Sequence, residues 1–300
     1  MGKKNRIFES TASSAESCNC KPTIYVLILC KGFVFSKNLT QKYKTLYNIP
    51  NDTLFVGKNL IELPSCQSTN DEAAALLNQQ PNVAEGSLIV TPQQTGGRGQ
   101  RGNTWLAVHG QNITCSFILK PTFLLAQQQF ALNVVAALAI AEMLQTVYGV
   151  PQVQIKWPND VYVADQKIAG ILIENSLQGN KIVHSIVGIG LNVNQTAFDA
   201  PNATSLQLQT AQTYDTDAVL SHLCSSLEKQ YMLLRGNQYN VLKTKYLAQM
   251  YRRGENALFL EVANNTTFAG EIIGFNDLGQ LAIRTAEQLR YFSFQEVRYL

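Results

Sequence analysis

The segment from Gly96 to Gly102 holds four glycines and two arginines within seven residues. This composition disfavours helix and strand, because glycine loses the most backbone freedom when it is ordered. A β-branched strand is predicted just before it, at residues 87–90, and another follows at residues 113–119. The segment is therefore predicted to be a loop between two strands of a mixed α and β chain.

The glycine-rich loop also has a chemical interpretation. Free backbone N–H groups and the guanidinium groups of Arg98 and Arg101 suit a phosphate or a carboxylate. No Gly-Lys-Ser/Thr closes the loop and no helix is predicted directly after it, which excludes a Walker A loop and a dinucleotide fingerprint. Two interpretations stay open: a mobile loop that closes over an anion and excludes water, and a solvated hairpin tip.

Three helices and one polar helix start are predicted. The helices cover residues 127–148, 216–235 and 238–251. Ser68, Thr69 and Asn70 precede an alanine-rich stretch, and Thr69 and Glu72 have the spacing of a capping box. These polar side chains either only start a helix or also line a pocket at its end.

Two further groups of residues are candidates for chemistry. Residues 153–157 and 161–163 are predicted to pair around a turn that carries Asn159 and Asp160, whose oxygens either bind Mg²⁺ or close the turn. Lys167 begins the next strand, where its ammonium either faces an anion or extends into solvent. Gly188 and Gly190 alternate in the apolar strand 182–193, which leaves room for a flat ligand or for close backbone packing.

The sequence divides into three predicted regions. Residues 1–52 form a poorly defined extension, residues 53–252 an α/β domain, and residues 253–300 a small β-barrel of short strands at 257–262, 267–275, 281–285 and 290–294. The α/β region is predicted to begin with extended structure at residues 53–57 and 60–63. His109, His184 and His222 lack a serine or cysteine motif, so the chemistry inferred is charge stabilisation without a covalent enzyme intermediate.

Composition excludes several classes of protein. With 46% hydrophobic and 15% charged residues the chain is globular. Residues 1–60 hold nine Lys/Arg against three Asp/Glu, and the remaining 240 residues fifteen against eighteen, unlike a dedicated nucleic-acid binder. Six irregularly spaced cysteines predict incidental thiols, and the early apolar run at residues 23–30 is too short to cross a membrane. We expect a cytoplasmic protein.

Four separated segments together resemble the biotin–protein ligases. They are Ser68-Thr69-Asn70, QTGGRGQRGNTW at residues 94–105, KWPND at 156–160 with KIAGILIE at 167–174, and GIGLN at 188–192. The resemblance covers residues 53–300 and implies a mixed-sheet α/β catalytic domain with an SH3-like C-terminal domain. It implies that biotin reacts with ATP in the presence of Mg²⁺ to give biotinoyl-5′-AMP. A lysine of a biotin carboxyl carrier protein then displaces AMP.

The resemblance also assigns roles to residues. Arg98 and Lys167 are the expected catalytic residues, placed together between the biotin carboxylate and the adenylate phosphate, and Asp160 is the candidate for Mg²⁺. The residues expected to contact biotin are Ser68, Thr69, Asn70, Gln94, Arg98, Gly99, Gln100, Lys167, Gly170, Gly188 and Gly190. Those expected to contact ATP or the adenylate are Arg98, Arg101, Trp105, Asn159, Lys167 and Asn192.

This sequence departs from the family in two places. Many members read Gly-Arg-Gly-Arg in the loop, and here Gln100 occupies the second arginine position, so weaker adenylate retention or compensation by Arg101 is expected. Some bacterial members also carry an N-terminal helix-turn-helix, which residues 1–52 do not show, so we expect no DNA binding. The resemblance is compatible with a homodimer.

Three other functions compete with biotin ligation. A lipoate-type ligase or transferase shares the fold and the acyl-adenylate chemistry. A non-enzymatic module that binds single-stranded RNA would need aromatic side chains between its basic residues, and only Trp105 is near the loop. An adaptor for carboxylase subunits would show no turnover.

Overall fold

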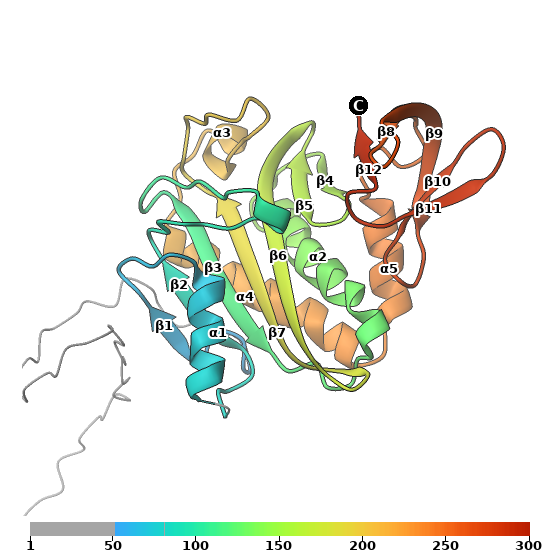
Figure 1. Ribbon diagram of the computed structural model, residues 1–300. Coiled ribbons are helices and arrows are strands. Elements are labelled where there is room, and N and C mark those ends of the chain that lie inside the picture. Colours follow the sequence, from blue (N-terminus) through green and yellow to red (C-terminus); the bar gives the residue numbers. More distant parts are fainter. Residues whose placement is uncertain (1–51, 81) are drawn as a thin grey trace, which may run out of the picture. The chain divides into compact units, whose positions relative to one another are not determined.

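A seven-stranded mixed sheet forms the centre of the protein in a computed structural model that describes residues 52–80 and 82–300 (Figure 1). The strands lie in the order β1-β2-β3-β7-β6-β5-β4; β1 and β2 pair in parallel, and all other neighbours are antiparallel. The strands are β1 (Leu60–Glu62), β2 (Ser87–Thr91), β3 (Asn112–Leu119), β4 (Val153–Lys156), β5 (Asp160–Val163), β6 (Gln166–Gln178) and β7 (Lys181–Asn192).

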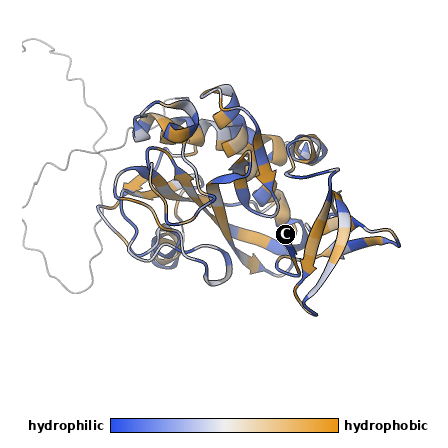
Figure 2. Ribbon diagram, turned by 90° about the horizontal axis from the view of Figure 1, so that it is seen from above, coloured by the Kyte–Doolittle hydropathy of each residue, from blue (hydrophilic) through white to orange (hydrophobic). Residues whose placement is uncertain are grey.

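Three helices cover one face of this sheet: α2 (Phe130–Thr146), α4 (Thr216–Arg235) and α5 (Tyr239–Ala248). Helix α2 is apolar on nearly all sides because it lies between the sheet and the other two helices (Figure 1). Among the described residues, only Ala126–Thr146 is long and apolar enough to cross a membrane, and 72% of that stretch is buried inside the protein. Figure 2 shows that apolar positions concentrate on the strands and on the helix faces turned toward them.

The opposite face of the sheet is covered only in part. Helix α1 (Thr69–Gln79) packs there through a small apolar cluster in which Ala73 meets Ile89, Ile118 and Ile186. Farther along β6 and β7 the same face carries glycines instead of large side chains. The fold thus leaves a shallow region beside the N-terminus of α1. The remaining short helix is α3 (Leu206–Thr210), and 3₁₀ turns cover Gln100–Gly102 and Ala126–Gln128.

A second, antiparallel sheet forms the C-terminal part, in the order β11-β10-β9-β8-β12. Its strands are β8 (Asn256–Glu261), β9 (Thr266–Phe275), β10 (Leu281–Arg284), β11 (Leu289–Phe292) and β12 (Val297–Tyr299). This sheet joins the larger one through Phe130, whose ring lies edge-on to Phe275 at 5.0 Å, and through Trp157, whose Nε1 donates to the Gly279 carbonyl at 2.9 Å. The predicted α/β class with a small C-terminal β-unit is confirmed.

Several local predictions need correction. Residues 53–57 form turns instead of extended structure, because the N–H groups of Leu54, Phe55 and Val56 bond to the Glu228 carboxylate and not to a strand. The predicted capping box is absent: Ser68 is the N-cap residue, and its side chain makes no capping bond. Strand β12 and helix α3 were not predicted, since each has no more than five residues. The proposed extension at residues 1–52 lies, apart from Asp52, outside the described residues.

Candidate functional site

A cavity of about 1020 Å³ opens on the α1 side of the sheet and extends toward the C-terminal strands. It brings together residues from all four of the segments noted in the sequence. The predicted site residues that line it are Ser68, Thr69, Asn70, Gln94, Arg98, Gly99, Gln100, Trp105, Asn159, Asp160, Lys167, Gly170, Gly188 and Gly190. Asn192 does not line the cavity; it is buried, and its Nδ2 donates to the Thr204 carbonyl at 2.9 Å. The side chain of Arg101 lies outside the described part of the structure.

Glycines form the floor because other atoms already occupy the space of a side chain. A Cβ at Gly188 would lie 2.3 Å from Asn70 Oδ1, and one at Gly190 would lie 2.2 Å from Cε2 of Trp105. Both distances are far below van der Waals contact. Gly188 pairs with Leu172 and Gly190 pairs with Gly170, so the gap continues across β6 and β7. The Trp105 ring thus lies directly on the floor, and its buried Nε1 has no hydrogen-bond partner among the described residues.

The first turn of α1 supplies a buried polar network. Thr69 donates to Gln94 Oε1 through its backbone N at 2.8 Å and through its hydroxyl at 3.2 Å. Ser116 Oγ in β3 lies 2.7 Å from the Thr69 hydroxyl and 2.6 Å from Asn70 Oδ1. The Thr69 hydroxyl therefore serves the cavity wall instead of a helix cap. Ser116 was not predicted, although a serine inside the apolar strand β3 is a signal that could have found it.

The glycine-rich loop is a small irregular hairpin. Trp105 N donates to the Gly97 carbonyl at 2.9 Å, and Gly99 N donates to the Asn103 carbonyl at 2.7 Å. A Cβ at Gly97 would come within 2.3 Å of the Trp105 carbonyl oxygen, so glycine is required at this crossing. The hairpin thereby ties the position of Arg98 to that of the Trp105 ring.

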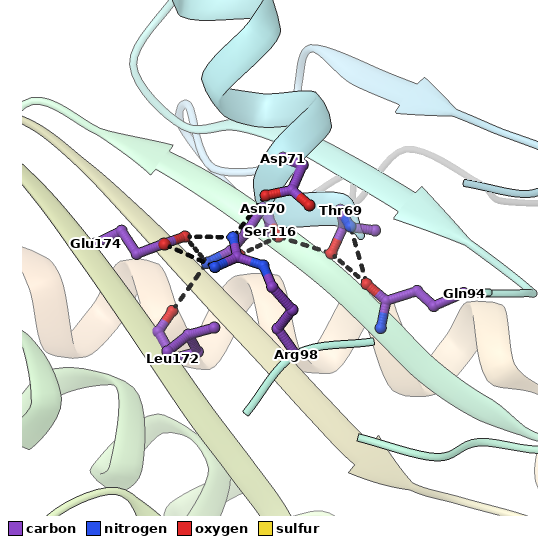
Figure 3. Close-up of polar contacts among 8 residues, drawn as sticks. All are labelled: Thr69, Asn70, Asp71, Gln94, Arg98, Ser116, Leu172 and Glu174. Carbon is purple, nitrogen blue, oxygen red and sulfur yellow. Dashed lines mark hydrogen bonds and ion pairs between the residues drawn. The ribbon is translucent and has the colours of Figure 1, made fainter. Parts of the chain in front are cut away.

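Arg98 lies between two carboxylates at the α1 end of the cavity (Figure 3). Its Nη2 is 2.6 Å from Asp71 Oδ1, and its two terminal nitrogens are each 3.1 Å from a Glu174 oxygen. The hydrogen bonds to Glu174 raise the pKa of Arg98, so its charge is permanent. Neither Asp71 nor Glu174 was predicted as a site residue, although Asp71 directly follows one recognised motif and Glu174 is the last residue of another.

Lys167 has a different partner at the other end. Its ammonium nitrogen is 2.7 Å from Asp160 Oδ1 and 5.7 Å from the centre of the Trp105 ring. It also approaches Gly170, where a Cβ would lie 3.3 Å from Nζ. Arg98 and Lys167 were expected together, but each is bound to its own carboxylate. Lys167 meets β6 at Gly170, whereas the Arg98 guanidinium meets it four positions further along, at Glu174.

Lys156 is a second cation at this end. Its ammonium lies over the rings of Tyr162, Tyr251 and Tyr299 at 4.8, 5.6 and 5.0 Å, and it donates to the Tyr162 hydroxyl at 3.3 Å. Burial lowers the pKa of Lys156. Three rings from β5, from the chain after α5 and from β12 thus place one positive charge where the two sheets meet the cavity.

The oxygen donors for a metal are few. Among residues 52–80 and 82–300 there is no group of three or more His, Cys, Asp or Glu residues able to hold an ion. Asp160 offers a carboxylate, and Asn159, which also lines the cavity, donates from Nδ2 to the Ile171 carbonyl at 2.9 Å. This donor set suits Mg²⁺ that arrives with phosphate oxygens, not a resident ion.

The described cysteines are inert. Cys66, Cys115 and Cys224 are free and buried, and burial raises the pKa of the Cys66 thiol to about 12. The prediction of incidental thiols fits these three residues. Cys18, Cys20 and Cys30 lie outside the described residues.

Comparison with known proteins agrees with the geometry of the cavity. Residues 63–192 match the biotin/lipoate A/B protein ligase family. The chain is 32% identical over 243 residues to the bifunctional ligase/repressor BirA of Bacillus subtilis, covering 79% of this chain and 73% of that protein. It is 32% identical over 231 residues to the biotin–[acetyl-CoA-carboxylase] ligase of Paracoccus denitrificans, covering 74% and 92%.

A solved structure agrees as well. The biotin protein ligase of Aquifex aeolicus, in complex with biotin and ATP, superposes with a TM-score of 0.67 at 29% identity. The match covers 81% of this chain and all of that one. The chain belongs to the biotin–protein ligase family, as the four sequence segments predicted.

Proposed function

We propose that this protein is an ATP-dependent ligase that activates biotin as biotinoyl-5′-AMP and transfers it to a lysine of a biotin carboxyl carrier protein. The observation that carries the proposal is the single cavity in which a polar network, a glycine floor and two lysines meet. Biotin is a flat apolar bicycle with a polar ureido group and a carboxylate tail. ATP adds a second anion, so the site must place two negative groups next to each other.

The α1 end of the cavity suits the ureido group of biotin. Ser68, Thr69 and Asn70 are buried there, and Gln94 bonds to Thr69. They offer donors and acceptors on one side, while Gly188 and Gly190 leave the opposite side flat. Gly170, Gly99 and Gln100 extend the wall along β6 and the loop.

The Lys167 end suits the reacting groups. We assign Lys167 to the biotin carboxylate and the α-phosphate, because its ammonium is part of the cavity wall beside Trp105. Arg98 is assigned to the same anions once it leaves its carboxylate partners. Trp105, Asn159, Arg101 and Asn192 are assigned to the nucleotide. Asn192 acts through its neighbours, since it does not reach the cavity.

The proposed reaction has two displacements. A carboxylate oxygen of biotin attacks the α-phosphorus of ATP, the bond to the bridging oxygen breaks, and pyrophosphate leaves. The ε-amine of the carrier lysine then attacks the acyl carbon of the mixed anhydride, the bond to the phosphate oxygen breaks, and AMP leaves while the amine loses a proton. The charge on Lys167 stabilises the first transition state, and the loop shields the anhydride from water. Asp160 would hold Mg²⁺ that arrives with ATP, and the ion would supply positive charge to the phosphates.

The deciding experiment is transfer of labelled biotin to a purified carrier domain in the presence and absence of ATP. We expect covalent label on the carrier only with ATP, and pyrophosphate release that depends on biotin. Labelled lipoate in a parallel reaction tests the neighbouring branch of the family. Incorporation of lipoate but not biotin would reassign the substrate. If neither acid causes pyrophosphate release, the protein is not a ligase, and the adaptor function is the alternative that remains.

Three further points belong to the proposal. We place the reaction in the cytoplasm, where ATP and carrier proteins are present. A homodimer is proposed from the family resemblance alone, and size-exclusion chromatography with light scattering tests it. We also propose that the chain binds no DNA. A sequence-specific gel shift that is lost at high salt would contradict that.

A further inference from the structure

One guanidinium faces two carboxylates at the α1 end of the cavity (Figure 3). Asp71 and Glu174 together carry two negative charges against the single positive charge of Arg98. In this arrangement Arg98 presents no net positive charge to a ligand. An anion that approaches Arg98 therefore also meets the negative charge of the two carboxylates.

The two carboxylates are held by the rigid parts of the fold. Asp71 belongs to the first turn of α1, next to the buried Asn70. Glu174 belongs to β6, and its Oε2 also accepts from Asn70 Nδ2 at 2.6 Å. Arg98, in contrast, belongs to the glycine-rich hairpin. The acidic pair therefore has a fixed position, and the arginine is the member that can leave.

Arg98 and Lys167 line the same cavity but meet β6 at different positions. Lys167 approaches β6 at Gly170, whereas Arg98 approaches it at Glu174. Four residues of an extended strand span roughly 13 Å. Arg98 is thus held by its own acidic pair, and Lys167 by Asp160.

We propose that Asp71 and Glu174 are positioning residues that hold Arg98, and with it the glycine-rich hairpin, in a resting place from which the adenylate must recruit it. This inference rests on the proposed function. Its consequence is quantitative: the apparent dissociation constant for the adenylate equals the intrinsic constant divided by the fraction of molecules in which Arg98 is free of the acidic pair. Weakening the pair shifts the population toward the binding-competent arrangement.

Asp71→Asn is the cleanest test, because this side chain contacts Arg98 and removing its charge leaves the Asn70 network intact. The probe is a non-hydrolysable sulfamoyl analogue of biotinoyl-AMP, with its dissociation constant measured by isothermal titration calorimetry. We expect binding about two- to fivefold tighter than for the wild type, the range of a half-exposed ion pair. Equal or weaker binding would overturn the proposal.

Three further variants separate positioning from a general effect of charge. Asp71→Glu restores the wild-type constant if the carboxylate itself retains Arg98. In an Arg98→Ala background, Asp71→Asn has no effect if Asp71 acts only through Arg98. Asp199→Asn, which removes an exposed carboxylate of the same type, leaves the constant unchanged. A gain in the Arg98→Ala background, or with Asp199→Asn, would mean that bulk charge is responsible and would overturn the proposal.

The failure of this inference differs from a failure of the proposed function. If the wild type neither binds the analogue nor catalyses biotin-dependent exchange of pyrophosphate with ATP, the function is wrong. If the wild type does both and Asp71→Asn gains nothing, the function stands and the resting place for Arg98 is wrong.

Discussion

The Lys167 ammonium lies 2.7 Å from the Asp160 carboxylate, next to the glycine floor and beside the Trp105 ring. Asp160 is the first residue of β5, where it pairs with Gly170 of β6, so the sheet fixes its position. The ion pair holds Lys167 in the wall of the cavity, where its N–H groups can donate to a bound anion.

Lys167→Met removes that charge and is expected to lower adenylate formation by on the order of 10²-fold or more, the cost of losing one electrostatic donor in a transition state. The measurement is biotin-dependent exchange of pyrophosphate with ATP. Lys181→Met, on an exposed lysine at the start of β7, is the matched control and keeps wild-type exchange. Near-normal exchange in Lys167→Met would refute the assignment.

Gly190→Ala is expected to displace Trp105, because the new Cβ would lie 2.2 Å from Cε2 of its ring. Adenylate formation falls by roughly 10²-fold as the hairpin loses its place, and tryptophan fluorescence changes. Gly236→Ala, at the end of α4 with φ −79° and its nearest contact at 3.2 Å, is the control with neither effect. Unchanged fluorescence with full activity would show that the floor tolerates a methyl group.

Lys156→Met tests the charge in the tyrosine cage. Loss of a cation at the cavity is expected to raise KM for ATP by about five- to tenfold, because a triphosphate carries several negative charges. The affinity for biotin stays the same. Lys156→Arg keeps the charge and its contact with the rings, and it should retain most of the ATP affinity. A loss in biotin affinity equal to the loss for ATP would indicate a structural role instead.

Glu228→Gln tests the segment before β1. The buried carboxylate accepts three backbone N–H groups, from Leu54, Phe55 and Val56 at 2.7, 2.8 and 3.0 Å. An amide offers one acceptor oxygen and turns its NH₂ toward a donor, so the free energy of unfolding falls by about 2–3 kcal/mol. Thermal unfolding followed by circular dichroism reports this as a lower Tm. Glu255→Gln, on the exposed surface, is the comparison; equal Tm values would contradict the prediction.

Asp217 predicts a pH dependence. Burial raises its pKa from the ordinary value of 3.8 to about 6. Ionising Asp217 therefore costs more free energy in the folded protein than in the unfolded chain. The stability that its neutral form contributes is complete below pH 4 and is lost as the pH rises through 6. Asp217→Asn is therefore expected to be more stable than the wild type by about 1 kcal/mol at pH 7.5, after allowance for partial exposure to solvent. Denaturant unfolding at pH 4 and pH 7.5 measures it; the same gain at both pH values would exclude titration of Asp217.

The sequence predicted most of the regular structure because the patterns were long. Helix α4 was predicted with its observed bounds, and α2 and the long strands β6 and β7 differ from prediction by a few residues at their ends. Residues 53–57 were misjudged because a distant carboxylate, Glu228, satisfies their N–H groups, and contacts across more than 170 residues leave no periodic signal.

The candidate site was predicted in composition but not in arrangement. Motif segments contain most of the lining residues, since glycines and paired charges are rare inside apolar strands, but the C-terminal residues 293–299 that also line the cavity were missed. Which carboxylate each cation contacts depends on the register of β5, β6 and β7 and on the approach of α1. For this reason Arg98 was expected beside Lys167, while Asp71, Glu174 and Ser116 were missed.

Consecutive residues in the first turn of α1 make two kinds of contact. Thr69 and Asn70 belong to the polar network of the cavity wall, and Asp71 binds the hairpin through Arg98. The same helical turn therefore links the shape of the cavity to the position of the glycine-rich hairpin. A small apolar contact that includes Ala73 and Ile118 packs that helix against the sheet. Substitutions beneath α1, far from any ligand, should thus alter ligand fit and loop closure together, and they would resemble active-site lesions in a genetic screen.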